Sequence, residues 1–276
     1  MSPLHLTRSR TNRSIMRGVC VLVAGVLAGC VVDDLDLSET TDEVQTTNRL
    51  AANRLAANRL AANRLAANSL GAAALTSGAL IETVEGRDVF SYIVSCALPA
   101  GRSVTVQDSH GTSYTFNGEI GLAPGWQTTT PTVAERHWVT ACLLARTNYY
   151  GVSVQLSMRG AHPALAATST ETSTYKVAEG AFYGDLFATT QSWYACGTKK
   201  WTSTLAQDAQ RTCTISQDGI TTMCGFTYEH FCGSNFTQLN APTFPAACSN
   251  TKAPFGGCKG VEATTWAEVI TIFLKN

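Results

Sequence analysis

The sequence predicts an α+β fold, a mostly antiparallel β domain with one or two packed helices that disulfides stabilise. Three observations predict this fold: short alternating or fully apolar segments, one strongly capped amphipathic segment, and ten cysteines among 276 residues. Charged residues make up 14% of the chain, below the usual quarter or so, a composition that suits an exported β-rich chain. An all-helical fold is therefore not expected.

The first expected elements are a helix over residues 88–98 and a hairpin that follows it. Helical spacing places three apolar side chains on one face, namely Val89, Ile93 and Ala97. Two short strands are expected at residues 103–107 and 113–117, because the residues between them have the composition of a turn.

The strongest helix signal begins after Pro131. Thr132 and Glu135 have the spacing of a capping box, in which each side chain accepts a backbone N–H at the helix start. A core-facing apolar stripe follows, formed by Ala134, Trp138, Ala141, Cys142 and Ala145. Asn148 and Gly151 supply stop signals, so the helix is expected to end before them.

Three later segments complete the predicted secondary structure. Residues 152–158 alternate apolar and polar side chains, as expected for a strand with one buried face. Residues 269–274 are apolar on both faces, which predicts a strand covered on both sides. The threonine- and serine-rich run 168–174 is expected to form a loop or a strand.

The N-terminal thirty residues predict export. Four arginines precede an acid-free apolar run, residues 19–27, that is about nine residues long and too short to span a bilayer. The run ends in Leu27-Ala28-Gly29 directly before Cys30, which resembles the lipobox of bacterial lipoproteins. This resemblance implies removal of a signal peptide, residues 1–29, and acylation of Cys30, which anchors the chain to a membrane. Val31 after that cysteine favours the outer membrane by the sorting rule of the same family.

Two segments link the expected anchor to the domain. Residues 30–47 carry six acids and no base, and they are expected to form a disordered tether. Residues 48–70 repeat Asn-Arg-Leu-Ala-Ala with a five-residue period, which spreads the leucines around a helix axis and predicts a spacer without an apolar stripe. The alternative is that the arginines of the repeat bind anionic headgroups or lipopolysaccharide. The disulfide-rich domain is expected over residues 71–276.

The charge balance argues against a nucleic-acid partner. The chain has twenty basic and twenty acidic residues, and removal of residues 1–29 takes away four arginines and no acid. The mature chain therefore keeps sixteen basic residues against twenty acidic ones, whereas nucleic-acid binders usually carry a basic excess.

The cysteines predict disulfides. Once Cys20 leaves with the signal peptide and Cys30 is acylated, eight remain, an even number in an exported chain. Cys96 and Cys142 both lie on apolar helix faces and are expected to pair. The other six, whose pairing stays open, are Cys196, Cys213, Cys224, Cys232, Cys248 and Cys258. Pairing of the sequence neighbours Cys224 with Cys232 and Cys248 with Cys258 is attractive. Since the chain has no C-x-x-C motif, neither a metal nor another cofactor is predicted.

Candidate catalytic residues are few, because the sequence lacks the motifs G-x-S-x-G, H-E-x-x-H, G-x-G-x-x-G and the P-loop. For general acid–base catalysis the candidates are His162 together with Glu179 or Asp185. His137 flanks the apolar stripe of the expected helix and is interpreted as a packing histidine with satisfied polar atoms.

Candidate ligand-binding residues are aromatic. Tyr183, Trp193 and Trp201 lie near glycines or polar residues, and exposed rings in such surroundings form platforms for sugars or peptides. The alternative interpretation is that these rings belong to the core.

Two runs of sequence resemble a group of myxobacterial lipoproteins that share the lipobox and the Asn-starting five-residue repeats. The runs are residues 136–148 (RHWVTACLLARTN) and 179–184 (EGAFYG). The resemblance extends over about residues 85–200 and implies an exported location and a fold unit, without supplying a catalytic residue.

These observations together predict a membrane-anchored cell-surface lipoprotein. Its exported domain is expected to bind an extracellular ligand, such as a polysaccharide, the matrix or a neighbouring cell's surface component. The alternative is a secreted hydrolase that acts on polymer or cell-wall substrates.

Overall fold

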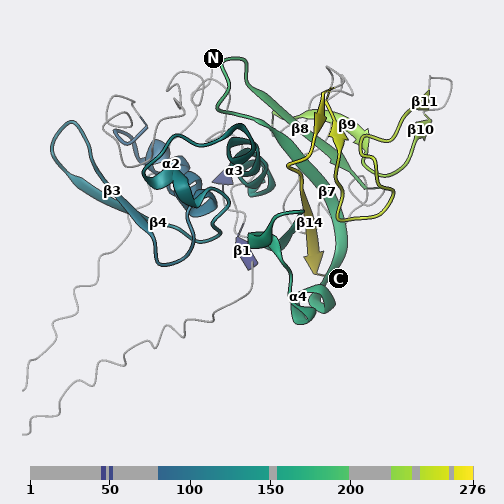
Figure 1. Ribbon diagram of the computed structural model, residues 1–276, viewed down its shortest axis with the longest axis horizontal. Helices are drawn as coiled ribbons and strands as arrows, with labels where there is room; N and C mark the ends of the chain where they lie inside the picture. Colours follow the sequence, from purple (N-terminus) through teal and green to yellow (C-terminus); the bar gives the residue numbers. More distant parts are fainter. Residues whose placement is uncertain are drawn as a thin grey trace, which may run out of the picture. The chain divides into compact units, whose positions relative to one another are not determined.

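The computed structural model describes residues 45–47, 50–51, 80–148, 154–198, 225–237, 243–260 and 264–275 (Figure 1). Within these ranges the chain forms mostly antiparallel sheets with three α-helices, which confirms the predicted α+β class. No described helix is long and apolar enough to cross a membrane.

The main sheet has six strands in the order β1-β6-β14-β7-β8-β9. Neighbouring strands are antiparallel except for β8 and β9, which run parallel. Their bounds are Gln45–Thr47 (β1), Gln155–Arg159 (β6), Ile270–Lys275 (β14), Tyr175–Asp185 (β7), Ser192–Gly197 (β8) and Thr227–Phe231 (β9).

Strand β14 lies inside this sheet, between β6 and β7, and is buried on both faces. Ile270, Ile272 and Leu274 belong to the larger apolar core. On the other face, the Thr271 hydroxyl accepts the N–H of Phe255 at 2.7 Å. The predicted two-sided strand at the end of the chain is therefore confirmed.

Helices α2 (Val84–Ala97) and α3 (Val133–Ala145) contribute to the larger core on one face of the sheet. Figure 1 shows α3 beside β7 and β14, with α2 next to it. The predicted capping box of α3 is present: Glu135 N–H donates to Thr132 Oγ1, and Thr132 N–H donates to Glu135 Oε2. The first helix begins earlier than predicted, because the Thr83 hydroxyl caps it by accepting the N–H of Gly86.

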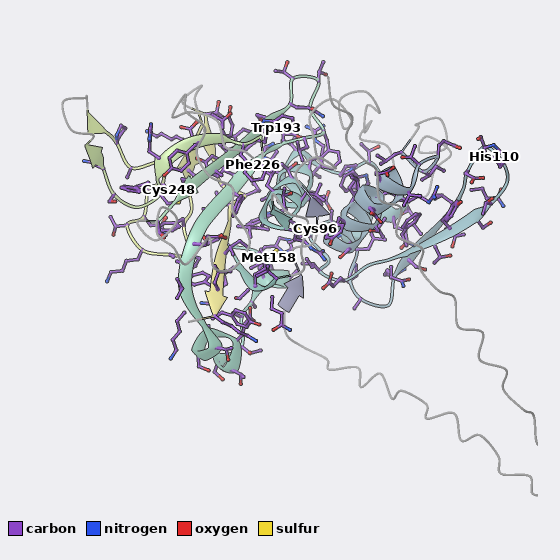
Figure 2. All side chains as sticks on the ribbon, turned by 180° about the vertical axis from the view of Figure 1, so that it is seen from behind. Cys96, His110, Met158, Trp193, Phe226 and Cys248 are labelled. Carbon is purple, nitrogen blue, oxygen red and sulfur yellow. A yellow bond between two sulfur atoms is a disulfide. The ribbon has the colours of Figure 1, made fainter. Side chains whose placement is uncertain are left out.

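The predicted hairpin is confirmed residue for residue as β3 (Ser103–Gln107) and β4 (Ser113–Asn117). Asp108 fixes its turn, because one carboxylate oxygen accepts the N–H groups of both His110 and Thr112. His110 lies at the tip of the hairpin and is exposed (Figure 2).

A second apolar cluster covers the opposite face of the sheet, and it has no described helix. It contains Tyr183, Tyr194, Phe255, Trp266 and Val269 together with four half-cystines. Irregular chain and the short strand pair β12 (Cys258–Lys259) with β13 (Thr265–Trp266) supply much of this cover. A further short pair is β10 (Phe236–Thr237) with β11 (Thr243–Phe244).

Three disulfides join described cysteines. Cys96–Cys142 links α2 to α3, as predicted, and Cys248–Cys258 confirms one of the two pairings of sequence neighbours. The other is wrong, since Cys232 pairs with Cys196 rather than with Cys224. The parallel pairing of β8 and β9 explains this, because it brings Cys196 beside the residue that follows β9. Figure 2 labels Cys96 and Cys248, which belong to the two different apolar clusters.

The run expected to be a loop or a strand is mostly a short helix, α4 (Ser169–Thr174). Thr168 caps it by accepting the N–H of Glu171 at 3.1 Å. Threonine and serine have low helix propensity, but the Thr168 cap stabilises the start of this short helix. In β6, Ser157 is buried although one polar face was expected, because β6 also has its other face covered.

Two short strands lie before the expected domain start at residue 71. β1 includes the last residues of the expected tether, and β2 (Leu50–Ala51), in the repeat region, pairs in parallel with β5 (Thr147–Asn148). Both strands add backbone groups to the edge of a neighbouring strand, which needs no apolar side-chain pattern and so left no signal in the sequence.

Several predictions fall outside the described residues. They concern the signal peptide, Cys30, most of the tether and repeats, Trp201, Cys213 and Cys224.

The Cys96–Cys142 disulfide should contribute strongly to stability, since it closes a separation of 46 residues between two core helices. We expect Cys142→Ala to lower the free energy of unfolding by about 2–5 kcal/mol in urea denaturation. Cys96→Ala and the double variant break the same bond and should show about the same loss. Equal unfolding midpoints for oxidised parent and variant would contradict this role.

Candidate functional site

The first turns of α3 carry two adjacent side chains, Arg136 and His137, that contact Asp185 at the end of strand β7. The capping box fixes where α3 begins, and Arg136 and His137 follow one and two residues after Glu135. The end of β7 is tied to the same helix, because the N–H of Leu186 donates to Thr140 Oγ1 at 3.0 Å. The capping box and the Leu186–Thr140 hydrogen bond therefore place the start of α3 beside the end of β7.

Gly184 allows β7 and β8 to approach closely beside this contact. Its φ is +142°, and a Cβ added there would lie 2.2 Å from the backbone oxygen of Ser192. The next residue, Asp185, is thereby held against α3, and its Oδ1 accepts the N–H of Phe187 at 2.8 Å.

His137 is the centre of a charged group that we call the His137 cluster, which comprises Arg136, His137, Asp185 and Glu268. His137 Nδ1 lies 3.1 Å from Glu268 Oε2, and Nε2 lies 3.6 Å from Asp185 Oδ2. Arg136 Nη2 lies 3.1 Å from the same Asp185 oxygen. The side chains of His137, Asp185 and Glu268 are 16%, 6% and 19% exposed, so the ion pairs are largely shielded from water.

The cluster shifts the pKa values of two of its members. Burial disfavours the charged imidazole, but the carboxylates of Asp185 and Glu268 outweigh it and raise the pKa of His137. Burial likewise opposes the charged form of Asp185, yet His137, the Phe187 N–H and Arg136 together lower its pKa. At neutral pH both carboxylates favour the doubly protonated, positively charged imidazole.

Two buried donors beside the cluster lack an acceptor. They are Arg136 Nε and the indole Nε1 of Trp266, a ring that packs edge-on against His137 with centroids 4.6 Å apart. A buried N–H without a partner costs about 1–3 kcal/mol, so this part of the fold carries a local penalty.

The arrangement binds a proton and joins three segments of the chain. Because each ring nitrogen of His137 faces a carboxylate, both nitrogens act as N–H donors and neither keeps a lone pair for general-base catalysis. The interpretation of His137 as a satisfied packing histidine is thus confirmed, with two ion pairs in addition.

The structure pairs Asp185 with His137, whereas the sequence suggested His162. His162 caps the short 3₁₀ helix η3 (Pro163–Leu165), where its Nδ1 accepts the N–H of Ala164 at 3.1 Å. Burial lowers its pKa, so the ring is neutral at pH 7, and the proton then lies on Nε2. Among the described contacts none joins His162 to Asp185 or Glu179, and Glu179 is buried within β7.

The two described aromatic candidates, Tyr183 and Trp193, pack against the apolar clusters of the domain. Tyr183 is fully buried, and its hydroxyl donates to the carbonyl of Lys259 at 2.8 Å, so its ring is a core residue and not a surface platform. Trp193, labelled in Figure 2, is partly buried against the larger core.

Three half-cystines form the group of described side chains that most resembles a metal site. The sulfurs of Cys196, Cys248 and Cys258 lie within 4.8 Å of one another, and Cys196 Sγ is 3.5 Å from Cys248 Sγ. Each of these sulfurs already belongs to a disulfide, whereas a metal needs free thiolates. The group therefore belongs to two disulfides packed against each other.

Sequence reasoning missed Arg136, Glu268 and Trp266. Glu268 is 131 positions from His137, and no motif connects the two. The start of α3 could have indicated Arg136, because the capping box determines which side chains of the first turns face the sheet.

Compared with known protein families, curated proteins and solved structures, the chain matches none.

We expect Asp185→Asn to lower the pKa of His137, because the variant removes one of the two carboxylates that raise it. The imidazole titration, followed by NMR, measures this shift. Asp108→Asn, in the hairpin turn, is the matched control and should leave the titration unchanged. An unaltered His137 titration in Asp185→Asn would show that the ion pair is not formed.

Proposed function

We propose that the protein is a membrane-anchored cell-surface lipoprotein whose exported domain binds an extracellular ligand. The observation that carries the export is the apolar run that ends in Leu27-Ala28-Gly29-Cys30 after four arginines. The three disulfides among described cysteines support it, since disulfides persist in oxidising compartments.

Binding is favoured over turnover by the state of the two best histidine candidates. Both ring nitrogens of His137 face carboxylates, and Nδ1 of His162 accepts the N–H of Ala164, so a general-base role would require breaking an ion pair or a helix cap. Asp185 is also engaged, by Arg136 and by the N–H of Phe187.

The exposed face of the β3–β4 hairpin suits a neutral ligand rich in hydroxyl groups, such as a polysaccharide. It carries six exposed, uncharged polar side chains: Ser103, Thr105, Gln107, Ser113, Thr115 and Asn117. Cross-strand hydrogen bonds order four of them, with Thr105 Oγ1 and Thr115 Oγ1 2.9 Å apart and Gln107 Nε2 donating to Ser113 Oγ at 3.1 Å. Each hydroxyl both donates and accepts, which matches the groups of a sugar.

The anchor is tested by metabolic labelling. We expect radiolabelled palmitate to enter the protein in the native host and to be lost in Cys30→Ser, because acylation requires the cysteine of the lipobox. Cys20→Ser, inside the signal peptide, is the control and should keep the label. Absence of label in the parent protein would contradict the anchor.

Binding and turnover are separated with the full-length Cys30→Ser chain and a panel of purified neutral and anionic polysaccharides. We expect saturable binding to a neutral polymer without release of reducing ends. Thr105→Ala/Thr115→Ala should weaken binding about tenfold, since two hydrogen bonds contribute about 0.5–1.5 kcal/mol each. Thr172→Ala on α4 should have no effect. Release of reducing ends that His162→Ala abolishes would instead establish the hydrolase.

A further inference from the structure

We propose that the His137 cluster is a pH-controlled latch, which holds residues 264–269 against helix α3 and releases them when His137 loses its proton. The latch acts whichever ligand the domain binds. It follows from the burial of the cluster, the three segments it joins and the unpaired donors beside it.

The latched segment contacts α3 through two side chains. Glu268 reaches His137 Nδ1 at 3.1 Å, and the Trp266 ring packs against the imidazole with centroids 4.6 Å apart. Asp185 at the end of β7 lies on the other side of the ring. One imidazole therefore bridges β7 and the segment that leads into β14.

The charge of the cluster depends on His137 alone in the neutral and alkaline range. The charged groups that face the imidazole are Asp185 from β7, Glu268 from the latched segment and Arg136 from α3 itself. With His137 protonated, two cations balance two carboxylates. After its deprotonation Arg136 alone faces both carboxylates, and one ring nitrogen turns a lone pair toward a carboxylate oxygen.

The closed latch is also opposed by its own unsatisfied donors. Arg136 Nε and Trp266 Nε1 have no acceptor while the segment is closed, and water supplies one when it opens. The ion pairs of protonated His137 must offset this penalty. Loss of the proton removes that compensation and favours opening.

The direction of the pH effect follows from linkage. The closed state raises the pKa of His137 above that of an exposed histidine, which is about 6.5. The latch is therefore fully stabilised below about pH 6.5, and this stabilisation is lost as the pH rises to the pKa of the closed state. Between these two limits each pH unit multiplies the opening equilibrium constant by about ten.

Opening uncovers an aromatic surface. Trp266 packs on Tyr194 at a centroid distance of 6.0 Å, and Tyr194 stacks on Tyr183 at 5.6 Å. All three rings are buried in the closed state. Opening also breaks the pairing of β13 with β12, whereas β12 itself stays attached through the Cys258–Cys248 disulfide.

The test uses the full chain with Cys30→Ser and ¹⁵N-labelled tryptophan, whose indole N–H signals NMR resolves. Trp266→Phe assigns the signal of Trp266. From pH 5.5 to 9.5 we expect the solvent exchange of the Trp266 indole, corrected for its intrinsic pH dependence, to rise together with the His137 titration, by about tenfold for each pH unit between the His137 pKa values of the open and closed states. The indole of Trp126, buried in the larger core, is the internal control and should stay protected.

Variants distinguish the latch from general loosening of the fold. His137→Phe keeps a ring but carries no proton, so Trp266 should be exposed to the same extent at every pH. Glu268→Gln removes one carboxylate and should move the transition to lower pH, which provides the test if His137→Phe fails to fold. His162→Phe should leave the transition in place. A Trp266 signal that stays protected while His137 titrates, or a midpoint unchanged in Glu268→Gln, would overturn the proposal.

Discussion

The central sheet is buried on both faces, and each face needs a cover of its own. Strand β14 shows the constraint most clearly, with five consecutive buried residues between β6 and β7. Helices α2 and α3 cover one face with an apolar core of the usual kind. The other cover has no described helix and consists largely of irregular chain, a kind of layer that disulfides often stabilise. Two disulfides provide such a constraint there.

The arrangement ties the fold to its chemical surroundings. Cys196 and Cys232 join neighbouring strands, and Cys248 and Cys258 close the loop layer above them. A reducing compartment would remove these bonds and leave the second face of the sheet with a weak cover. Disulfides persist in oxidising compartments, so these bonds are consistent with the export proposed from the N-terminal sequence.

Those features that depend on neighbouring residues were predictable. The capping box of Thr132 and Glu135, the hairpin and the two-sided strand at the end of the chain all follow from local spacing. Cys96 and Cys142 were also predictable, since both lie on apolar helix faces and no other described cysteine lies on a helix.

Features that depend on sheet order were not predictable. The parallel neighbours β8 and β9 decide that Cys232 pairs with Cys196, and nothing near either cysteine in the sequence encodes that order. The same limit explains why Asp185 was assigned to His162. Its true partner, His137, lies on α3, and only the packing of α3 on β7 brings the two together. Glu268 is more distant still in sequence, and it reaches His137 because it lies just before β14, which is a central strand of the sheet.

The two covers of the sheet meet at the His137 cluster, where α3 from the helical side contacts the segment that enters β14. At this location a change in the protonation of His137 can alter the attachment of residues 264–269 without unfolding the whole domain. The disulfides on either side do not titrate, so loss of a proton at His137 can free residues 264–269 while the loop layer stays attached at Cys258. Because the pKa of Asp185 is lowered and that of His137 is raised, the two groups are charged together over a wider pH range than they would be if exposed. The proposed export would expose the domain to pH changes that the cytoplasm buffers, and an imidazole between two carboxylates is well suited to respond to them.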